Sequence, residues 1–181
     1  MNEAASGGVR GEVFDLLVVG AGPTGLACAI EAQKAGFKAV LVDKGCICHS
    51  LFHYPSHMTF FTTPELLEIG GIPFPSPNAK PTRDEALQYY RRVAVYFGLE
   101  VRTYHRVERV TGADGAFAIH TIDRFGRTGT IQARKLALST GYYDLPNRLG
   151  IPGRTSRGSG GNQFCRGKFF RRDGRKTGRI R

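Results

Sequence analysis

Residues 13–43 read VFDLLVVGAGPTGLACAIEAQKAGFKAVLVD, and this stretch decides the fold. The apolar run at residues 13–19 ends at a glycine and predicts a parallel strand that is buried on both faces. Residues 26–35 are small and apolar and predict a helix, which Gly36 ends. A second apolar run, residues 37–42, predicts another strand. The stretch therefore predicts one βαβ unit.

Three glycines in this stretch, Gly20, Gly22 and Gly25, have the spacing of a dinucleotide-binding turn. The first permits the sharp turn, the second lets a pyrophosphate approach the backbone, and the third lets the helix pack on the strand. The pyrophosphate is expected at the positive end of the helix. Asp43 ends the second strand, 18 residues after Gly25, where a carboxylate binds a ribose. Because that carboxylate repels a 2′-phosphate, the site favours FAD or NAD over NADP. The alternative is a turn that packs the unit without any ligand.

The middle of the chain is less regular. Residues 45–81 are rich in proline and aromatic residues, and we expect a helical turn at residues 65–69. Thr82-Arg83-Asp84-Glu85 is a capping box that begins a helix over residues 86–97, and Gly98 ends this helix. We expect the tyrosines of this helix to pack inward.

Alternating patterns follow the helix. They predict a half-buried strand over residues 99–107 and a hairpin between residues 117–121 and 128–133. Residues 136–141 predict a short strand that ends in a turn of small residues. The sequence thus predicts an α/β fold with a parallel sheet, helices and a smaller antiparallel meander.

The charge of the chain is concentrated in its last residues. The 181 residues have a net charge of +11, but residues 154–181 alone hold ten basic residues and one acidic residue. The rest of the chain has an ordinary globular composition. It contains no apolar run near the roughly 18 residues of a membrane span and no signal-peptide pattern at its start. We therefore expect a cytoplasmic protein with reduced cysteines.

Four stretches carry a family resemblance: DLLVVGAGPTGLACAIEAQKAGF, KGCICHSLFHYPSHMTFFTTPELLEIGGIPF, SPNAKPTRDEALQYYRRV and LSTGYYDLPNRLGIPG. Over residues 14–153 the chain resembles the N-terminal half of the bacillithiol-disulfide reductase family, within the thioredoxin-reductase-like class. The resemblance implies a Rossmann-like FAD domain with an inserted NADPH domain. It also implies that NADPH reduces the flavin by hydride transfer and that the flavin reduces a low-molecular-weight disulfide. We expect this chain to be an N-terminal fragment, truncated before the NADPH domain, that alone binds FAD weakly and turns over poorly.

The resemblance assigns FAD-binding residues but no catalytic residue. The glycines would hold the pyrophosphate, Asp43 the ribose, and Val107 the adenine through its backbone. The full set is Gly20, Gly22, Pro23, Thr24, Gly25, Asp43, Lys44, His53, Thr59, Val107, Thr140 and Gly141. Thr24 departs from the family, because well-known members carry a proposed redox Cys at this position. Threonine cannot form a mixed disulfide, which excludes a thiol mechanism through residue 24.

A group of metal-capable side chains follows the second strand: Cys46, Cys48, His49, His53 and His57. A Cys-x-Cys pair is unusual for zinc, and Pro55 interrupts any helix that would align the histidines. We therefore expect no metal. A strained redox disulfide between the two cysteines stays open as an alternative. Cys28, on the first helix, is interpreted as a buried structural thiol.

The basic tail leaves several interpretations open. We divide the chain into a leader (1–12), an FAD-binding part (13–153) and a tail (154–181). The tail is a nucleic-acid arm, an inconsequential disordered extension, or the product of a changed reading frame near Pro152. We prefer the last, because the chain changes character where a second dinucleotide site should begin. Two functional alternatives remain: a flavin monooxygenase-like enzyme, and a dinucleotide-binding protein with a nucleic-acid-binding arm. The expected partner is a small-molecule disulfide. We expect neither membrane nor nucleic-acid binding, and self-association stays open.

Overall fold

The strand–helix–strand unit expected at the start of the chain is present in the computed structural model, which describes residues 12–142. Strand β1 (Val13–Val19) leads through the glycine turn into helix α1 (Pro23–Lys34), and β2 (Ala39–Val42) pairs parallel with β1. The helix begins earlier than expected because proline suits the first helical position, where no N–H is needed. Strand β2 begins later than expected and leaves Phe37 55% exposed.

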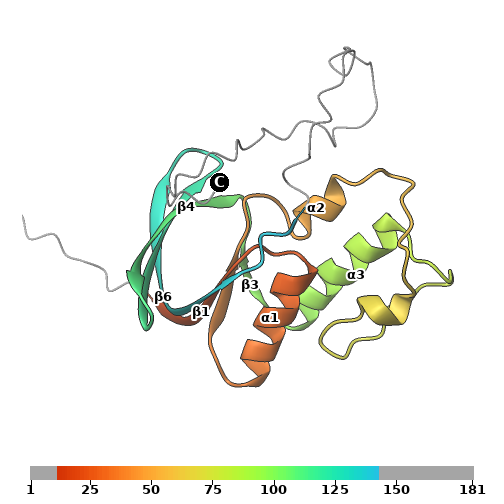
Figure 1. The fold of residues 1–181 in the computed structure, drawn as a ribbon, viewed down its shortest axis with the longest axis horizontal. Coiled ribbons are helices and arrows are strands. Elements are labelled where there is room, and N and C mark those ends of the chain that lie inside the picture. Colours follow the sequence, from red (N-terminus) through yellow and green to blue (C-terminus); the bar gives the residue numbers. More distant parts are fainter. Residues whose placement is uncertain (1–11, 143–181) are drawn as a thin grey trace, which may run out of the picture.

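Six strands form one mixed sheet in the order β3-β2-β1-β6-β5-β4 (Figure 1). Strands β3 (Glu100–Arg102), β2, β1 and β6 (Thr128–Leu138) are parallel neighbours. Strands β4 (His105–Ala113), β5 (Ala116–Asp123) and β6 form an antiparallel meander. The predicted combination of a parallel sheet with a smaller meander is therefore confirmed.

Two strand predictions were wrong. Residues 99–107 do not form one strand, because Tyr104 adopts a left-handed φ of 58° and separates β3 from β4. Residues 136–138 are not a separate strand, since they form the end of β6. The first part of β6, residues 128–133, pairs with β5. The second part, residues 132–138, pairs with β1.

Helix α3 (Arg83–Tyr96) has the predicted capping box at Thr82 and Glu85, and it lies beside α1 on one side of the sheet (Figure 1). Short helices α2 (His49–Phe52) and η1 (Pro64–Leu67) occur in the proline-rich region. The tyrosines of α3 pack inward as expected: the Tyr89 hydroxyl donates to the Ile72 carbonyl at 2.7 Å, and the Tyr90 hydroxyl to the Leu67 carbonyl at 3.0 Å. Helix α3 thereby anchors the irregular segment.

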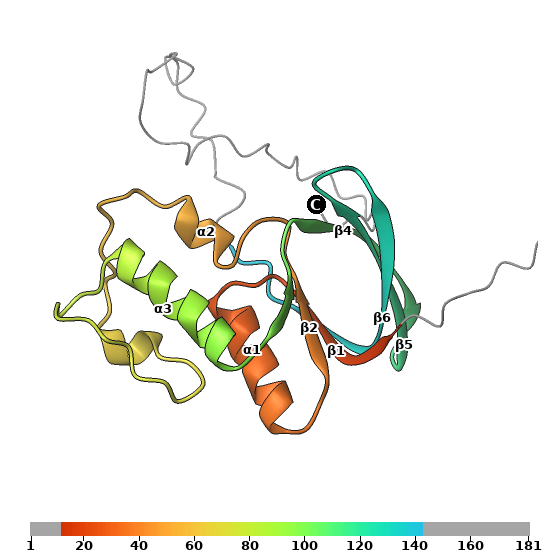
Figure 2. The ribbon, with the colours of Figure 1, turned by 180° about the vertical axis from the view of Figure 1, so that it is seen from behind.

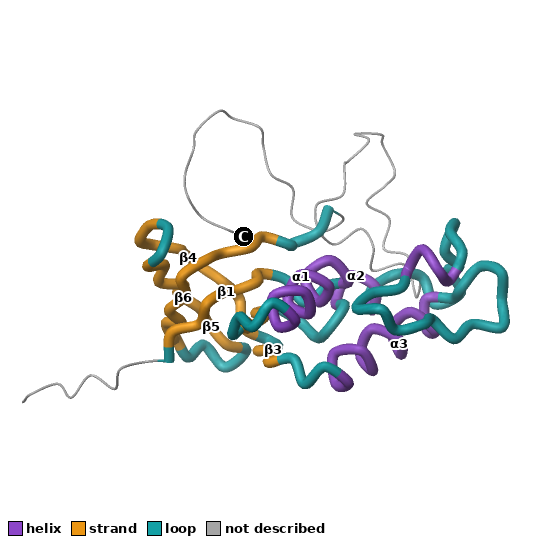
Figure 3. The backbone as a smooth tube through the Cα atoms, turned by 90° about the horizontal axis from the view of Figure 1, so that it is seen from below, coloured by secondary structure: helices purple, strands orange, loops and turns teal. Residues whose placement is uncertain are grey.

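The sheet separates two hydrophobic cores. The first lies between the parallel strands and the helices and includes Val18, Leu26, Ile30, Leu41 and Val93. The second lies where the meander curls over the other face of the parallel strands, and it includes Phe14, Val40, Val42, Ile119 and Ile131 (Figures 2 and 3). Strand β2 is therefore covered on both faces, as its continuous apolar sequence predicts.

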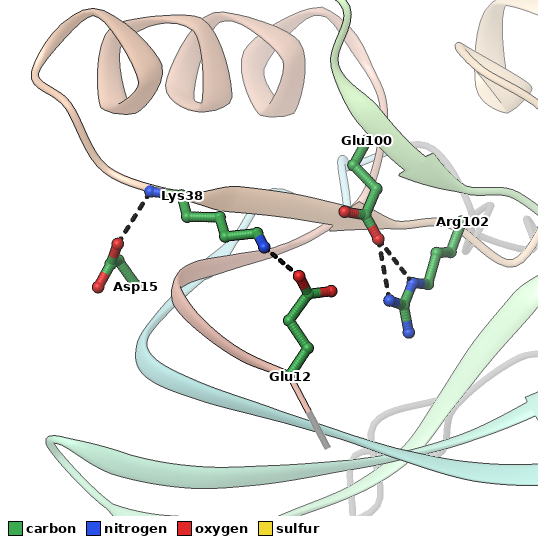
Figure 4. Close-up of polar contacts among 5 residues, drawn as sticks. All are labelled: Glu12, Asp15, Lys38, Glu100 and Arg102. Carbon is green, nitrogen blue, oxygen red and sulfur yellow. Dashed lines mark hydrogen bonds and ion pairs between the residues drawn. The ribbon is translucent and has the colours of Figure 1, made fainter. Parts of the chain in front are cut away.

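Polar contacts join the start of β1 to the start of β2, and they join two residues within β3 (Figure 4). The Lys38 main-chain N–H donates to the Asp15 carboxylate at 2.9 Å, and the Lys38 ammonium pairs with Glu12. Arg102 pairs with Glu100 at 2.9 Å. These pairs are solvent-exposed and contribute at most about 1 kcal/mol each. Within residues 12–142, no helix has the length and apolar character of a membrane span.

Candidate functional site

Two glycines of the β1–α1 turn are required by the packing of the chain itself. Gly20 has a φ of +107°, and a Cβ there would lie 2.3 Å from the Ser139 carbonyl oxygen. A Cβ on Gly25 would lie 2.0 Å from the Gly20 carbonyl oxygen. Packing alone therefore requires glycine at both positions, whether or not a ligand binds. These two glycines are equally consistent with a turn that packs the unit without any ligand.

Gly22 differs from its two neighbours. A Cβ at this position would meet no atom within 4 Å, and its φ of −79° suits any residue. It is the N-cap of α1, with no side-chain cap and no acidic residue in the first helical turn. The helix therefore contributes no acidic side chain to its own positive end, where the Asp43 carboxylate accepts only the N–H of Ala21, just before the N-cap. The packing of the chain gives no steric reason for a glycine here, whereas a closely approaching pyrophosphate does.

A cavity of about 490 Å³ opens in front of this turn. The β1–α1 turn, the end of β2, the segment around α2 and the chain after β6 together line it. Eight of the twelve predicted FAD-binding residues contribute to its wall: Gly20, Gly22, Pro23, Thr24, Asp43, Lys44, Thr140 and Gly141. The structure thus brings together residues from both ends of the described chain.

Four predicted residues do not line the cavity. Gly25 is buried beneath the turn. His53 is exposed, and its Nε2 lies 3.1 Å from Nε2 of His49, which does line the cavity. Thr59 is exposed and forms an isolated bridge with Thr82. The Val107 side chain is 5% exposed in the second core. The roles assigned to these residues stay predictions.

Asp43 joins the end of β2 to the glycine turn. Its Oδ2 accepts a hydrogen bond from the Ala21 main-chain N–H at 2.8 Å, and its Oδ1 accepts one from the Gly45 N–H at 2.8 Å. A carboxylate oxygen has two lone pairs, so each oxygen can also accept from a ribose hydroxyl. The carboxylate is therefore held in place at the cavity wall before any ligand arrives.

Ser139 is a structural residue of the site that the sequence analysis did not single out. Its hydroxyl donates to the carbonyls of Val19 at 3.0 Å and Gly20 at 2.9 Å. This contact ties the end of β6 to the glycine turn and brings the following residues to the cavity. The cavity wall also contains His49, Ser50 and Tyr142, which were missed. The turn of small residues after β6 was the signal for this part of the wall.

The cysteines of the described chain are free thiols. Cys48 is buried with a φ of 56°, and its N–H donates to the Ala21 carbonyl at 2.9 Å. Burial raises the pKa of its thiol to about 12, which Arg91 opposes and Asp43 reinforces. The Sγ atom of Cys46 lies 3.9 Å from His49 Nδ1 and 3.8 Å from Arg91 Nη2. Among residues 12–142 no three His, Cys, Asp or Glu side chains are grouped to hold a metal ion.

The sheet topology and the glycine turn define a dinucleotide-binding domain of the Rossmann-like class. A sequence model described as pyridine nucleotide-disulphide oxidoreductase matches residues 17–166. The chain belongs to this family of flavin-dependent enzymes, whose members use FAD and NADPH. The match extends beyond residue 142. The predicted domain boundary at residue 153 and the interpretations of the tail lie outside the described residues and stay untested.

Known relatives confirm the predicted resemblance. Bacilliredoxin reductase Bdr of Bacillus subtilis is 38% identical over 138 residues, which cover 76% of this chain and 41% of that protein. The structure of bacillithiol disulfide reductase Bdr from Bacillus cereus matches with a TM-score of 0.76 at 38% identity, covering 81% of this chain and 45% of the other. The enzyme of the same name from Staphylococcus aureus matches with a TM-score of 0.70 at 33% identity, covering 78% and 42%. The chain spans less than half the length of each.

Proposed function

We propose that this chain provides the FAD-binding part of an NADPH-linked oxidoreductase that reduces a low-molecular-weight thiol disulfide. The family match supports the reaction class. The names of the Bacillus and Staphylococcus relatives support a disulfide of the bacillithiol type as the substrate. The parallel sheet and the cavity at its carboxyl edge support the cofactor class, because ligands of such folds bind at this edge.

The observation that carries the proposal is the open space at Gly22. A glycine that no neighbouring atom requires is explained by a ligand that approaches the main chain closely. The uncapped start of α1 would hold the FAD pyrophosphate through its main-chain N–H groups. Asp43 would bind the ribose, while Thr140 and Gly141 would line the same cavity. When bound, FAD supplies two-electron transfer between NADPH and a disulfide.

Thr24 limits the mechanism of the proposed enzyme. It is exposed in the first turn of α1 and lines the cavity. Its hydroxyl can donate and accept hydrogen bonds, but it cannot attack a disulfide and form a mixed disulfide. In the proposed reaction, residue 24 therefore takes no part in thiol exchange.

Flavin titration of the full chain tests the proposal. FAD is added to the purified protein, and binding is followed by the change in flavin fluorescence. We expect Gly22→Val to weaken FAD binding more than tenfold, because the side chain would occupy the space of the pyrophosphate. Gly129→Val is the matched control, since Gly129 lies among the exposed first residues of β6 and a Cβ there meets only Thr121 Oγ1 at 3.5 Å. Equal FAD affinity for Gly22→Val and wild type would contradict the proposal, as would the absence of FAD binding in the wild type.

The reaction class needs a separate measurement. Because the chain spans less than half the length of its relatives, bound FAD is reduced chemically with dithionite in the absence of oxygen, and a low-molecular-weight disulfide is then added as acceptor. The proposal predicts that thiol is formed in step with reoxidation of the flavin. A reduced flavin that the disulfide does not reoxidise would contradict the proposed reaction.

A further inference from the structure

The segment after β2 places a partly exposed thiol between a histidine and an arginine. The Sγ atom of Cys46 lies within 4 Å of both His49 Nδ1, at 3.9 Å, and Arg91 Nη2, at 3.8 Å. His49 begins α2 and Arg91 lies on α3, and these two helices contact each other (Figures 1 and 2). The packing of α2 on α3 therefore brings the guanidinium to a thiol that is 45 residues away in the sequence.

The imidazole of His49 is held in place beside this thiol. A Cβ on Gly45 would lie 2.2 Å from His49 Nδ1, so the ring occupies the space that a side chain at residue 45 would need. The main chain of Gly45 is itself fixed, because its N–H donates to Asp43 Oδ1 at 2.8 Å. On the far side of the ring, His49 Nε2 lies 3.1 Å from Nε2 of His53. The histidine next to Cys46 is therefore positioned from two directions.

The two flanking groups suit a thiol that reacts as a nucleophile. When His49 donates from Nε2 to His53, its Nδ1 has a free lone pair and can accept the proton of the Cys46 thiol. The Arg91 guanidinium then faces a thiolate, which a cationic donor binds more strongly than it binds a neutral thiol. None of the ion pairs in the described part of the chain involves Arg91. Its charge can therefore attract an anionic reactant as well.

Cys46 differs in its surroundings from the other cysteines that the structure describes. Cys48 is 1% exposed in the first hydrophobic core, and Cys28 packs against the same core. All three are free thiols, but only Cys46 lies outside that core among residues 12–142. A disulfide between Cys46 and either neighbour would require a thiol to leave the core, whereas a small disulfide from solution can approach the partly exposed sulfur of Cys46.

We propose that Cys46 is an S-thiolation site, at which the thiol exchanges with a low-molecular-weight disulfide that bears carboxylates. His49 takes the thiol proton, and the Cys46 sulfur attacks one sulfur of the small disulfide. The S–S bond of the small molecule breaks as the mixed disulfide with Cys46 forms, and the departing thiolate takes the proton from His49 and leaves as a thiol. The small disulfide is thus the oxidant, and the step needs neither flavin nor NADPH. Because His49 also lines the cavity, the adduct forms at the cavity edge.

Glutathione disulfide, which bears carboxylates, tests the site on the full, reduced chain without flavin. Mass spectrometry follows the glutathione adduct, which Cys48→Ala should retain and Cys46→Ser should lose. We expect Cys46 to react faster in the native protein than in urea, although it is partly buried only in the native state. His49→Gln and Arg91→Gln should each slow the native reaction about fivefold, the scale of one exposed polar interaction. Arg92→Gln is the matched control, because Arg92 is the neighbouring exposed arginine of α3 and lines a different cavity.

Cystamine, which bears amines in place of carboxylates, separates recognition from reactivity. Arg91→Gln should lower the ratio of the glutathione disulfide rate to the cystamine rate, because the guanidinium attracts the first reactant and repels the second. An unchanged ratio would overturn the selection by charge, and equal rates for wild type, His49→Gln and Arg91→Gln would reduce Cys46 to an ordinary exposed thiol. Adducts confined to other cysteines, or a disulfide between Cys46 and Cys165 in place of the adduct, would overturn the site. None of these outcomes depends on FAD binding, so the proposed function stands or fails separately.

Discussion

The carboxylate of Asp43 accepts a hydrogen bond from the main-chain N–H of Ala21 at 2.8 Å, and so links the end of β2 to the glycine turn after β1. Its second oxygen accepts from the Gly45 N–H at 2.8 Å. One side chain therefore satisfies two main-chain donors and fixes the two strand ends relative to each other. The residue expected to bind a ribose also holds the wall of its own cavity together.

Replacing Asp43 should affect both stability and binding. Asp43→Asn turns one carboxylate oxygen into an NH₂ group, which would face a main-chain N–H. Leaving that N–H unpaired should lower the free energy of unfolding by about 1–2 kcal/mol and weaken FAD binding. Urea denaturation and flavin titration measure the two effects. Asp114→Asn is the control, because the one ion pair of Asp114 within residues 12–142 is an exposed pair with Lys135. Unchanged stability of Asp43→Asn would show that the two hydrogen bonds contribute little.

Gly25 and Gly22 should respond differently to the same substitution. A Cβ on Gly25 would lie 2.0 Å from the Gly20 carbonyl oxygen and 2.7 Å from Ser139 Oγ, so Gly25→Ala forces the turn and β6 apart. We expect a loss of about 3 kcal/mol in the free energy of unfolding. Gly22→Ala meets no atom within 4 Å and should lose about 1 kcal/mol or less, the usual cost at an N-cap. Thermal and urea unfolding compare the two, and equal losses would contradict the packing argument.

The capping box of α3 should make stability depend on pH. The Thr82 main-chain N–H, 2.6 Å from Glu85 Oε2, and then the Thr82 hydroxyl hold the pKa of Glu85 below its ordinary value. A carboxyl group whose pKa is lower in the folded state stabilises the protein above the pKa of the unfolded chain. This contribution is lost as the pH falls through the lowered pKa. The stability difference between wild type and Glu85→Gln should therefore be largest near neutral pH and shrink in acid.

Thr82 variants serve as controls for this pH dependence. Thr82→Ser retains the hydroxyl and should keep the profile of the wild type, whereas Thr82→Val removes the hydroxyl but keeps the main-chain N–H and should weaken the pH dependence only in part. Urea denaturation across the acid range gives the profiles. A constant difference between wild type and Glu85→Gln at every pH would contradict the assignment.

The parts of the fold that were predictable depend on local signals. The apolar runs of β1 and β2, the glycines between them and the capping box at Thr82 each specify their own structure. The break at Tyr104 had no such signal, because the alternation of Val101, Thr103, His105 and Val107 continues through it. Hydrogen bonds to Asp43 and Gly45 divide the strand, and these residues are distant in sequence.

The candidate site likewise contains some residues that were predictable from local motifs and others that were not. Gly22 and Asp43 were predictable because a motif fixes their spacing, and both line the cavity. Ser139 reaches the turn only through the pairing of β6 with β1, at a separation of about 120 residues. The sequence analysis predicted His53 on the cavity wall, but His49 lies there instead. The left-handed φ of 56° at Cys48 sets the direction of α2, which carries His49. The pattern of residue types contains no sign of that backbone conformation.

Burial should protect Cys48 from alkylation. Its pKa is raised to about 12 by burial, so at pH 8 the thiol is protonated and shielded, while Cys46 is partly exposed. Since the thiolate is the reactive form, iodoacetamide should label Cys46 in the native protein and Cys48 only in urea. The variants Cys46→Ser and Cys48→Ala each retain one cysteine of the pair. Mass spectrometry of their peptides therefore gives the rate of alkylation at each position. Rapid native labelling of Cys48, or recovery of the two residues as a disulfide, would contradict a buried structural role and favour a redox pair.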